Sequence, residues 1–170
     1  GRVRRHLAGW SGVPMMLQFP YQGALLTGPT PPSLPPLTTI RWRPLVPASV
    51  LGPMGARRFF PCALLDPGAD DTVFPLAVAE LVGVALRPDS GHGLRWRGQG
   101  YPLRFGDVEL ELDDELNTWR WPAVIGFSPA PLRYPILGLA GCLQFFDARF
   151  RGQVRIVELE TNASYPGTTN

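Results

Sequence analysis

The sequence predicts a mainly β domain of about seven or eight short strands and two short helices, arranged as a small barrel or a sandwich. Twenty prolines and nineteen glycines among 170 residues break the chain too often for long helices. Apolar and polar residues alternate over several short segments, as they do in half-exposed strands. The hydrophobic fraction of 45% and the charged fraction of 18% are those of a folded domain with its own core.

Residues 1–38 are expected to form an N-terminal tail and a proline-rich arm outside the main domain. The first residue is Gly rather than Met, and Met15-Met16 precedes the first coherent segment, so we expect little structure from residues 1–14. Residues 28–36, with the sequence GPTPPSLPP, can supply almost no hydrogen bonds to a sheet. This composition is typical of an extended, polyproline-like linker or arm.

The main domain is expected to span residues 39–160. Residues 40–43 alternate apolar and charged side chains and predict a half-exposed strand. Residues 59–65 are a short, mainly apolar run that ends at a turn, which is typical of a buried strand. Residues 73–86 place apolar side chains at helical spacing and predict a helix of about ten residues.

The second half of the chain continues the pattern of short elements. Residues 88–100 are glycine-rich and carry no core pattern, which suits a hairpin or a mobile loop. Residues 139–146 predict the second short helix, and residues 161–170 are expected to be a polar C-terminal tail. Further strands are expected at residues 108–112, 122–127, 134–137 and 154–159.

The charge and hydropathy of the chain exclude several classes of function. A formal charge of +2 is too small to indicate a nucleic-acid-binding surface. Arg2, Arg4 and Arg5 lack an aromatic stacking platform beside them and are interpreted as a solvated tail. No apolar run reaches the roughly 18 residues that span a bilayer, so no membrane partner is expected. No signal peptide is evident, which favours a cytoplasmic protein.

Cysteine and histidine are too few and too scattered to predict a metal site. Cys62 and Cys142 are interpreted as free thiols in a reducing compartment. His6 and His92 are the only histidines, and neither a zinc site nor a nucleophilic triad can be assembled credibly around them. We therefore expect no metal and no cofactor.

The segment most informative about chemistry is ALLDPGADDTVFP, residues 63–75. Apolar residues lead directly into Asp66, and Pro67 and Gly68 follow it. A buried strand therefore ends by presenting a carboxylate on a tight loop, where glycine lets the backbone turn. Because Asp before Pro-Gly is also ordinary turn chemistry, a purely structural role for Asp66 is an alternative interpretation.

This segment resembles the active-site loop of retropepsins, the aspartic proteases of retroviruses and their bacterial relatives. The family pattern is apolar-apolar-Asp-Thr/Ser-Gly-Ala-x-x-Thr/Ser. Residues 43–46 (RPLV) resemble the strand that precedes the active site in that family. Residues 134–138 (YPILG), followed by Leu139-Ala140-Gly141, resemble the segment that enters its C-terminal helix. The resemblance covers residues 39–160.

The resemblance implies a small closed barrel of the retropepsin type, with one lobe per chain, that works as a homodimeric aspartic endopeptidase. Each subunit would contribute Asp66, and the two carboxylates would share one proton while they activate a water molecule. A glycine-rich hairpin within residues 91–101, the flap, would close over a peptide or protein substrate. The residues implied to bind substrate are Gly68, Ala69, Asp70 and Asp71 on the loop, with Gly91, His92 and Gly93 or Gly98 and Gly100 at the flap tip.

Position 67 departs from the family pattern, because proline replaces its threonine or serine. Proline supplies neither the hydroxyl nor the N–H that link the two catalytic loops across the dimer axis in the family. Each lost hydrogen bond costs about 1 kcal/mol. The alternative to an active protease is therefore a weakened or inactive module that keeps the groove and binds peptides.

Two further features have simple interpretations beside the functional ones. Asp89-Ser90-Gly91 contains the Asp-Ser-Gly triplet of this enzyme class, but it follows no apolar strand and is expected to be a loop before the flap. Trp96, Trp119 and Trp121 can line a substrate groove or pack in the core or at a dimer interface, and the sequence leaves this open.

Overall fold

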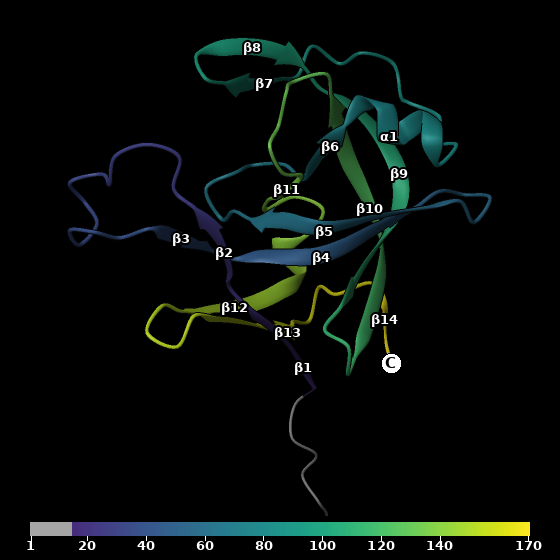
Figure 1. Ribbon diagram of the computed structural model, residues 1–170. Helices are drawn as coiled ribbons and strands as arrows, with labels where there is room; N and C mark the ends of the chain where they lie inside the picture. Colours follow the sequence, from purple (N-terminus) through teal and green to yellow (C-terminus); the bar gives the residue numbers. More distant parts are fainter. Residues whose placement is uncertain (1–14) are drawn as a thin grey trace, which may run out of the picture.

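The computed structural model describes residues 15–170 and shows a mainly β protein with one short α-helix (Figure 1). The strands are β1 (Met16–Pro20), β2 (Gln22–Leu25), β3 (Ile40–Arg43), β4 (Leu45–Leu51), β5 (Arg57–Leu65), β6 (Val73–Pro75), β7 (Gly93–Trp96), β8 (Gln99–Pro102), β9 (Arg104–Asp113), β10 (Thr118–Ser128), β11 (Ile136–Leu137), β12 (Phe146–Arg151), β13 (Ile156–Thr161) and β14 (Thr168–Thr169). The helix is α1 (Leu76–Leu81), and Leu143–Phe145 forms a 3-10 turn.

Six of these strands close into a mixed barrel. Hydrogen bonding runs in the order β10-β6-β11-β5-β4-β9, and β9 also pairs with β10, which completes the circle. β10 is parallel to β6, and β11 is parallel to β5, whereas the other four pairings are antiparallel. The prediction of a small closed β-barrel is therefore confirmed, and the sandwich is excluded.

The two long strands β9 and β10 supply much of the core. Their buried apolar residues are Val108, Leu110 and Leu112 on β9 and Trp119, Trp121, Ala123, Ile125 and Phe127 on β10. The spacing of two is the alternation expected of a half-exposed strand. Glu111 is also buried, and Arg57 and Arg120 hydrogen-bond its carboxylate, so this buried charge is paired on both oxygens.

Both helical segments are shorter than the sequence predicts. α1 has six residues rather than about ten, and the chain turns away at Gly83, whose φ of +71° a helix cannot continue. In the segment 139–146 only the 3-10 turn forms. The N–H groups of Leu139 and Ala140 are bonded to the loop that follows β5, and Gly141 has a φ of +87°, which a right-handed helix cannot continue.

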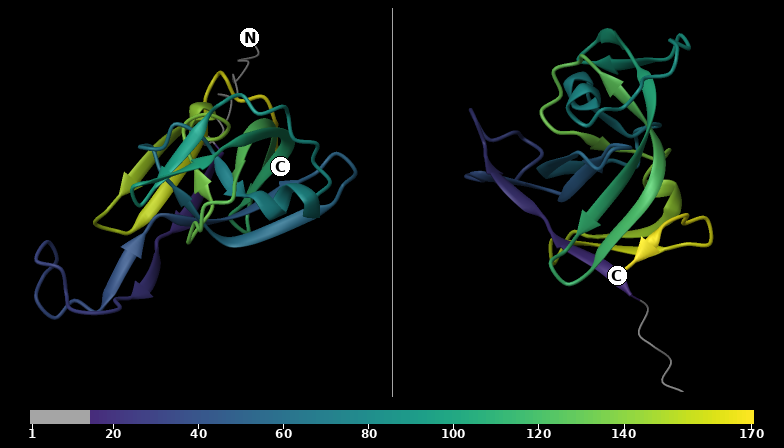
Figure 2. Two further views of the ribbon diagram at one scale, coloured as in Figure 1. Left: turned by 90° about the horizontal axis from the view of Figure 1, so that it is seen from above. Right: turned by 90° about the vertical axis from the view of Figure 1, so that its right-hand side faces the viewer.

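The folded part of the chain begins well before residue 39. β1 pairs with β13, and Leu17 and Phe19 on β1 are buried in the core. β2 and β3 form a separate hairpin that projects from the barrel, with the proline-rich segment as its connecting loop (Figure 2). The tail predicted over residues 1–38 is therefore wrong for β1.

β2 and the proline-rich loop belong to the projecting hairpin, so only the part of that prediction that concerns residues 1–14 falls outside the described residues. Residues 1–14, which include Arg2, Arg4, Arg5 and His6, are in this part of the chain.

The C-terminal segment packs against the barrel and is not a free tail. β14 pairs with β10. The ring of Tyr165 lies 6.3 Å from Trp119, 6.1 Å from Trp121 and 5.5 Å from Phe146, measured between ring centroids. Because Trp119 and Trp121 are fully buried, they belong to the core, and the polar tail predicted for residues 161–170 belongs to the fold.

Both cysteines are free, in agreement with the sequence interpretation. Cys142 is fully buried, and burial raises the pKa of its thiol far above the usual range, so the group stays protonated. No helix among residues 15–170 combines the length and the hydropathy needed to cross a membrane.

Candidate active site

Asp66 lies at the point where the chain leaves strand β5. Its backbone N–H donates to the Leu137 carbonyl at 3.0 Å, so the pairing of β5 with β11 extends to the aspartate. The carboxylate oxygen Oδ1 accepts the Gly68 N–H at 2.9 Å. The side chain is half-buried, and among residues 15–170 no group hydrogen-bonds its other oxygen. One oxygen therefore orients the carboxylate, and the second is available to a ligand.

The loop that follows Asp66 is held in place by residues 138–140. Two backbone N–H groups of this segment donate to the carbonyls of Ala69 and Asp70, both at 2.9 Å. Thr72 is buried and adds two further bonds. Its N–H donates to a carbonyl of the segment at 3.0 Å, and its hydroxyl accepts the Gly138 N–H at 3.2 Å. These bonds connect parts of the chain far apart in sequence and fix the loop that carries Asp66.

Strands β7 and β8 form the hairpin expected in the glycine-rich segment (Figure 1). Its two-residue turn is Arg97-Gly98, with φ values of +49° and +80°. Two positive φ values define a type I′ turn, in which glycine is favoured. The hairpin tip therefore falls at the second of the two glycine clusters that the sequence left open, and Gly91-His92-Gly93 lies at the base of the hairpin.

A groove of about 420 Å³ lies between the loop and the hairpin. Of the catalytic and substrate-binding residues that the resemblance implied, six line it: Asp66, Gly68, Ala69, Asp70, Asp71 and Gly93. The others that line it are Val73, Leu94, Arg95, Trp96, Leu103 and Ile136. The structure thus brings one carboxylate from a strand end together with a loop and a hairpin wall.

Four of the predicted substrate-binding residues do not line this groove: Gly91, His92, Gly98 and Gly100. The hairpin contributes strand side chains to the groove rather than its turn. The sequence analysis did not identify Leu94 and Arg95 as groove residues, and it left the role of Trp96 open. The two-residue spacing of Leu94 and Trp96 was a signal for one common strand face. His92 instead packs edge-on against Phe105, with ring centroids 5.8 Å apart.

The groove carries more negative than positive side chains. Asp66, Asp70 and Asp71 line it, and Arg95 is the lining cation. The pKa of the Asp71 carboxyl is raised, first by burial and then by the neighbouring Asp70, while His92 lowers it. None of the three aspartates forms an ion pair within the part of the chain that the structure describes. The groove therefore suits an occupant that brings hydrogen-bond donors or positive charge.

Pro67 is compatible with this loop. It is exposed at the tip, between Asp66 and Gly68, and both neighbours keep their hydrogen bonds. The Ala69 N–H still donates to the Asp66 carbonyl at 3.1 Å across it. Proline therefore does not disturb the loop within one chain. It removes only the N–H and the hydroxyl that a residue at this position would offer to a second copy of the chain.

The fold and the site define a closed β-barrel that presents one strand-end aspartate, Asp66, with two loop aspartates in a groove beneath a β-hairpin. Among residues 15–170 no group of three or more His, Cys, Asp or Glu side chains could hold a metal ion. Comparisons with protein-family models, with curated proteins and with solved structures found no match to the chain.

Proposed function

We propose that this protein is an aspartic endopeptidase of the retropepsin type that acts as a homodimer. The observation that carries the proposal is the position of Asp66. A carboxylate at the end of strand β5, with one oxygen free, faces a groove large enough for part of a peptide. The sequence of its loop supports the same conclusion, since it resembles the retropepsin loop at every position of that pattern except residue 67.

The proposed chemistry requires two carboxylates at the catalytic position. One chain supplies only Asp66 at this position, the end of β5. In the dimer the second would come from Asp66 of a second copy. Two carboxylates about 3 Å apart share one proton, because both cannot ionise at that distance. The ionised one takes a proton from a water molecule, which attacks the scissile carbonyl carbon, while the protonated one hydrogen-bonds the carbonyl oxygen. The tetrahedral intermediate then collapses as the amide nitrogen receives a proton and leaves as an amine.

The remaining groove residues have supporting roles in this proposal. Asp70 and Asp71 offer acceptors to the backbone N–H groups of an extended substrate. Leu94 and Trp96 on β7 cover the groove with apolar surface and reduce the access of water. Arg95 offers a donor to substrate carbonyl groups.

The experiment that tests the proposal compares the parent chain with Asp66→Asn on a mixed peptide library at acidic and neutral pH, with and without pepstatin. We expect pepstatin-sensitive cleavage by the parent and none by the variant, with unchanged thermal unfolding. The matched control is Asp89→Asn. Asp89 accepts the Gly91 N–H at 2.9 Å, the same local bond that Asp66 makes with Gly68, but it does not line the groove. Cleavage by Asp66→Asn at the parent rate would refute the assignment.

Pro67 favours a second candidate function, a peptide-binding module without catalysis. The two candidates differ in their response to Pro67→Thr, which restores a hydroxyl and an N–H at the loop tip. A gain of cleavage from an inert parent identifies a weakened protease. Peptide binding without cleavage in both forms identifies the binding module. Sedimentation is the companion measurement, because a monomer at working concentration contradicts the two-carboxylate mechanism.

A further inference from the structure

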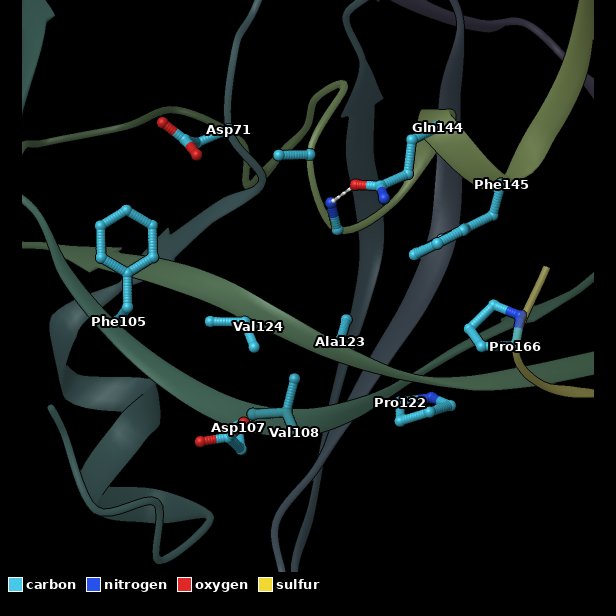
Figure 3. A pocket seen from close by; sticks show the side chains of 12 residues that line it. Asp71, Phe105, Asp107, Val108, Pro122, Ala123, Val124, Gln144, Phe145 and Pro166 are labelled. Atoms are coloured by element: carbon cyan, nitrogen blue, oxygen red, sulfur yellow. Dashed lines mark hydrogen bonds between the residues drawn. The ribbon is translucent and has the colours of Figure 1, made fainter. Parts of the chain in front are cut away.

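A second groove lies on the other side of Asp71, and the proposed chemistry does not use it. Its volume is about 580 Å³, larger than that of the groove at Asp66. Figure 3 shows that it is bounded by β9 and β10 below and by the turn that carries Gln144 and Phe145 above. Pro166 closes the end farthest from Asp71.

The floor of this second groove is apolar and open to solvent. Val124 on β10 is 40% exposed, although its neighbour Ala123 is buried. Phe105, Phe145 and Pro122 surround them. Outward positions of a solvated strand are ordinarily polar, so a concave apolar surface at this place favours contact with another apolar group.

Two polar side chains border the groove, Gln144 on the turn above the floor and Asp71 at one end. Gln144 accepts the Gly141 N–H through its Oε1 at 2.8 Å (Figure 3), which leaves its amide NH2 as a donor. Asp107 also lines the groove, but it is paired with Arg87 at 2.9 Å. Asp71 is therefore the carboxylate of this groove without a cationic partner among residues 15–170.

The two grooves share one lining residue, Asp71. A peptide segment that extends beyond the first groove at Asp71 therefore has the second groove within its reach. We propose that the second groove is an accessory site for the substrate, holding an extended segment that lies outside the cleavage site and combines a lysine or arginine with large apolar side chains. The cation lies against Asp71, the apolar side chains cover Val124, and the Gln144 amide donates to a backbone carbonyl.

Charge selects a basic segment over an acidic one. Burial and then the negative charge of the adjacent Asp70 raise the pKa of the Asp71 carboxyl, and His92 on the hairpin side lowers it. A substrate cation at this point removes the repulsion, whereas a glutamate adds a third negative charge.

This inference rests on the proposed function for the identity of the occupant, so its test is arranged to work without cleavage. The probe is an array of immobilised peptides of about ten residues, long enough to lie across both grooves. Leu and Phe are combined with Arg in one set, with Glu in the second and with Gln in the third. Binding of Asp66→Asn protein is measured at neutral pH. We expect the Arg set to be retained at least about tenfold more tightly than the Glu set.

The decisive variants carry a second substitution in the Asp66→Asn background. Val124→Lys fills the floor and repels the cation, and Ala140→Lys does the same at the Asp71 end, where Ala140 is exposed. Either variant that remains folded should lose about tenfold or more in binding of the Arg set. Val154→Lys is the control, because Val154 is also an exposed valine, at 49%, and does not line this groove. It should leave binding unchanged.

The outcomes separate the two proposals. Equal retention of the Arg and Glu sets, or unchanged binding by Val124→Lys and Ala140→Lys, overturns the accessory site even if the parent chain cleaves peptides. A change in sedimentation with Val124→Lys and no change in peptide binding also overturns it, and assigns the groove to contact between copies. Selective binding by a parent chain that cleaves nothing supports the accessory site and refutes the endopeptidase.

Discussion

Gly138→Ala tests whether the position of Asp66 depends on the tertiary contact between residues 138–140 and the loop. Gly138 approaches the loop so closely that a Cβ added there would lie 2.2 Å from the Asp71 carbonyl oxygen and 2.8 Å from that of Ala69. Both neighbours are backbone atoms and cannot rotate away. Because ordinary contacts between heavy atoms are about 3.5 Å, the segment and the loop must separate by about 1 Å.

The cost follows from the bonds that such a separation stretches. Residues 138–140 and the loop share four hydrogen bonds, of 2.9, 2.9, 3.0 and 3.2 Å. Each contributes about 1 kcal/mol, and buried groups left without partners cost more. Partial relaxation recovers some of this, so we expect a loss of about 2–4 kcal/mol, against a total stability of about 5–15 kcal/mol for a domain.

Urea unfolding of the parent, Gly138→Ala and Gly152→Ala measures this loss. Gly152 is the matched control, because a Cβ there would meet no atom within 4 Å and its φ is not positive. We expect the control to remain within about 0.5 kcal/mol of the parent. A Gly138→Ala protein as stable as the control would refute the reasoning, since the loop would then adjust without loss. If the parent cleaves peptides, Gly138→Ala should also reduce cleavage, because Asp66 moves with the loop.

Two further predictions concern titratable side chains. The Tyr165 hydroxyl lies 2.7 Å from the Thr168 carbonyl and 3.1 Å from that of Arg120, so Tyr165→Phe should cost about 1 kcal/mol in urea unfolding near pH 7. Burial raises the pKa of Tyr165 to about 12 from 10.0, so the unfolded chain ionises first and the parent loses stability as the pH rises above 10. The stability gap to Tyr165→Phe should therefore narrow between pH 9 and pH 11, and a constant gap would contradict the contribution of burial. Asp71→Asn should unfold at a higher temperature than the parent at pH 7, because the raised pKa means that the folded state disfavours the charged carboxylate. This advantage should disappear below about pH 3, where the carboxyl is protonated in both states, and an advantage that persists there would have another cause.

Local patterns in the sequence were sufficient for the fold class and for most strands. Proline and glycine excluded long helices, alternation of apolar residues located β3 and β9, and an apolar run located β10. The apolar run before Asp66 also predicted correctly that a strand ends at this residue, but burial was overestimated, because Phe59 is 55% exposed and only Ala63 and Leu65 of β5 are buried. These features depend on neighbouring residues, because side-chain alternation and turn preference act over a few positions of the chain.

Other features needed contacts between distant segments. The sequence predicted a helix at residues 139–146, but the segment bonds to the loop at Ala69 and Asp70 and then turns at Gly141 with a φ of +87°, which a helix cannot continue. β1 and the C-terminal segment were assigned to tails because β1 is a single short strand next to a proline-rich segment and the C-terminus is polar. Their partners are β13 and β10.

The two grooves also combine features set by local sequence with features set by contacts between distant segments. The sequence by itself determined that Asp66 would be presented on a tight loop after a strand, because the residues that make this turn are consecutive. Only the tertiary structure decided that Leu94, Arg95 and Trp96 face that loop, and that Asp71 lies between two grooves. The reason is that closure of the barrel through β9 and β10 sets which distant side chains meet, and a pattern of period two gives the face of a strand but not the partner that it faces.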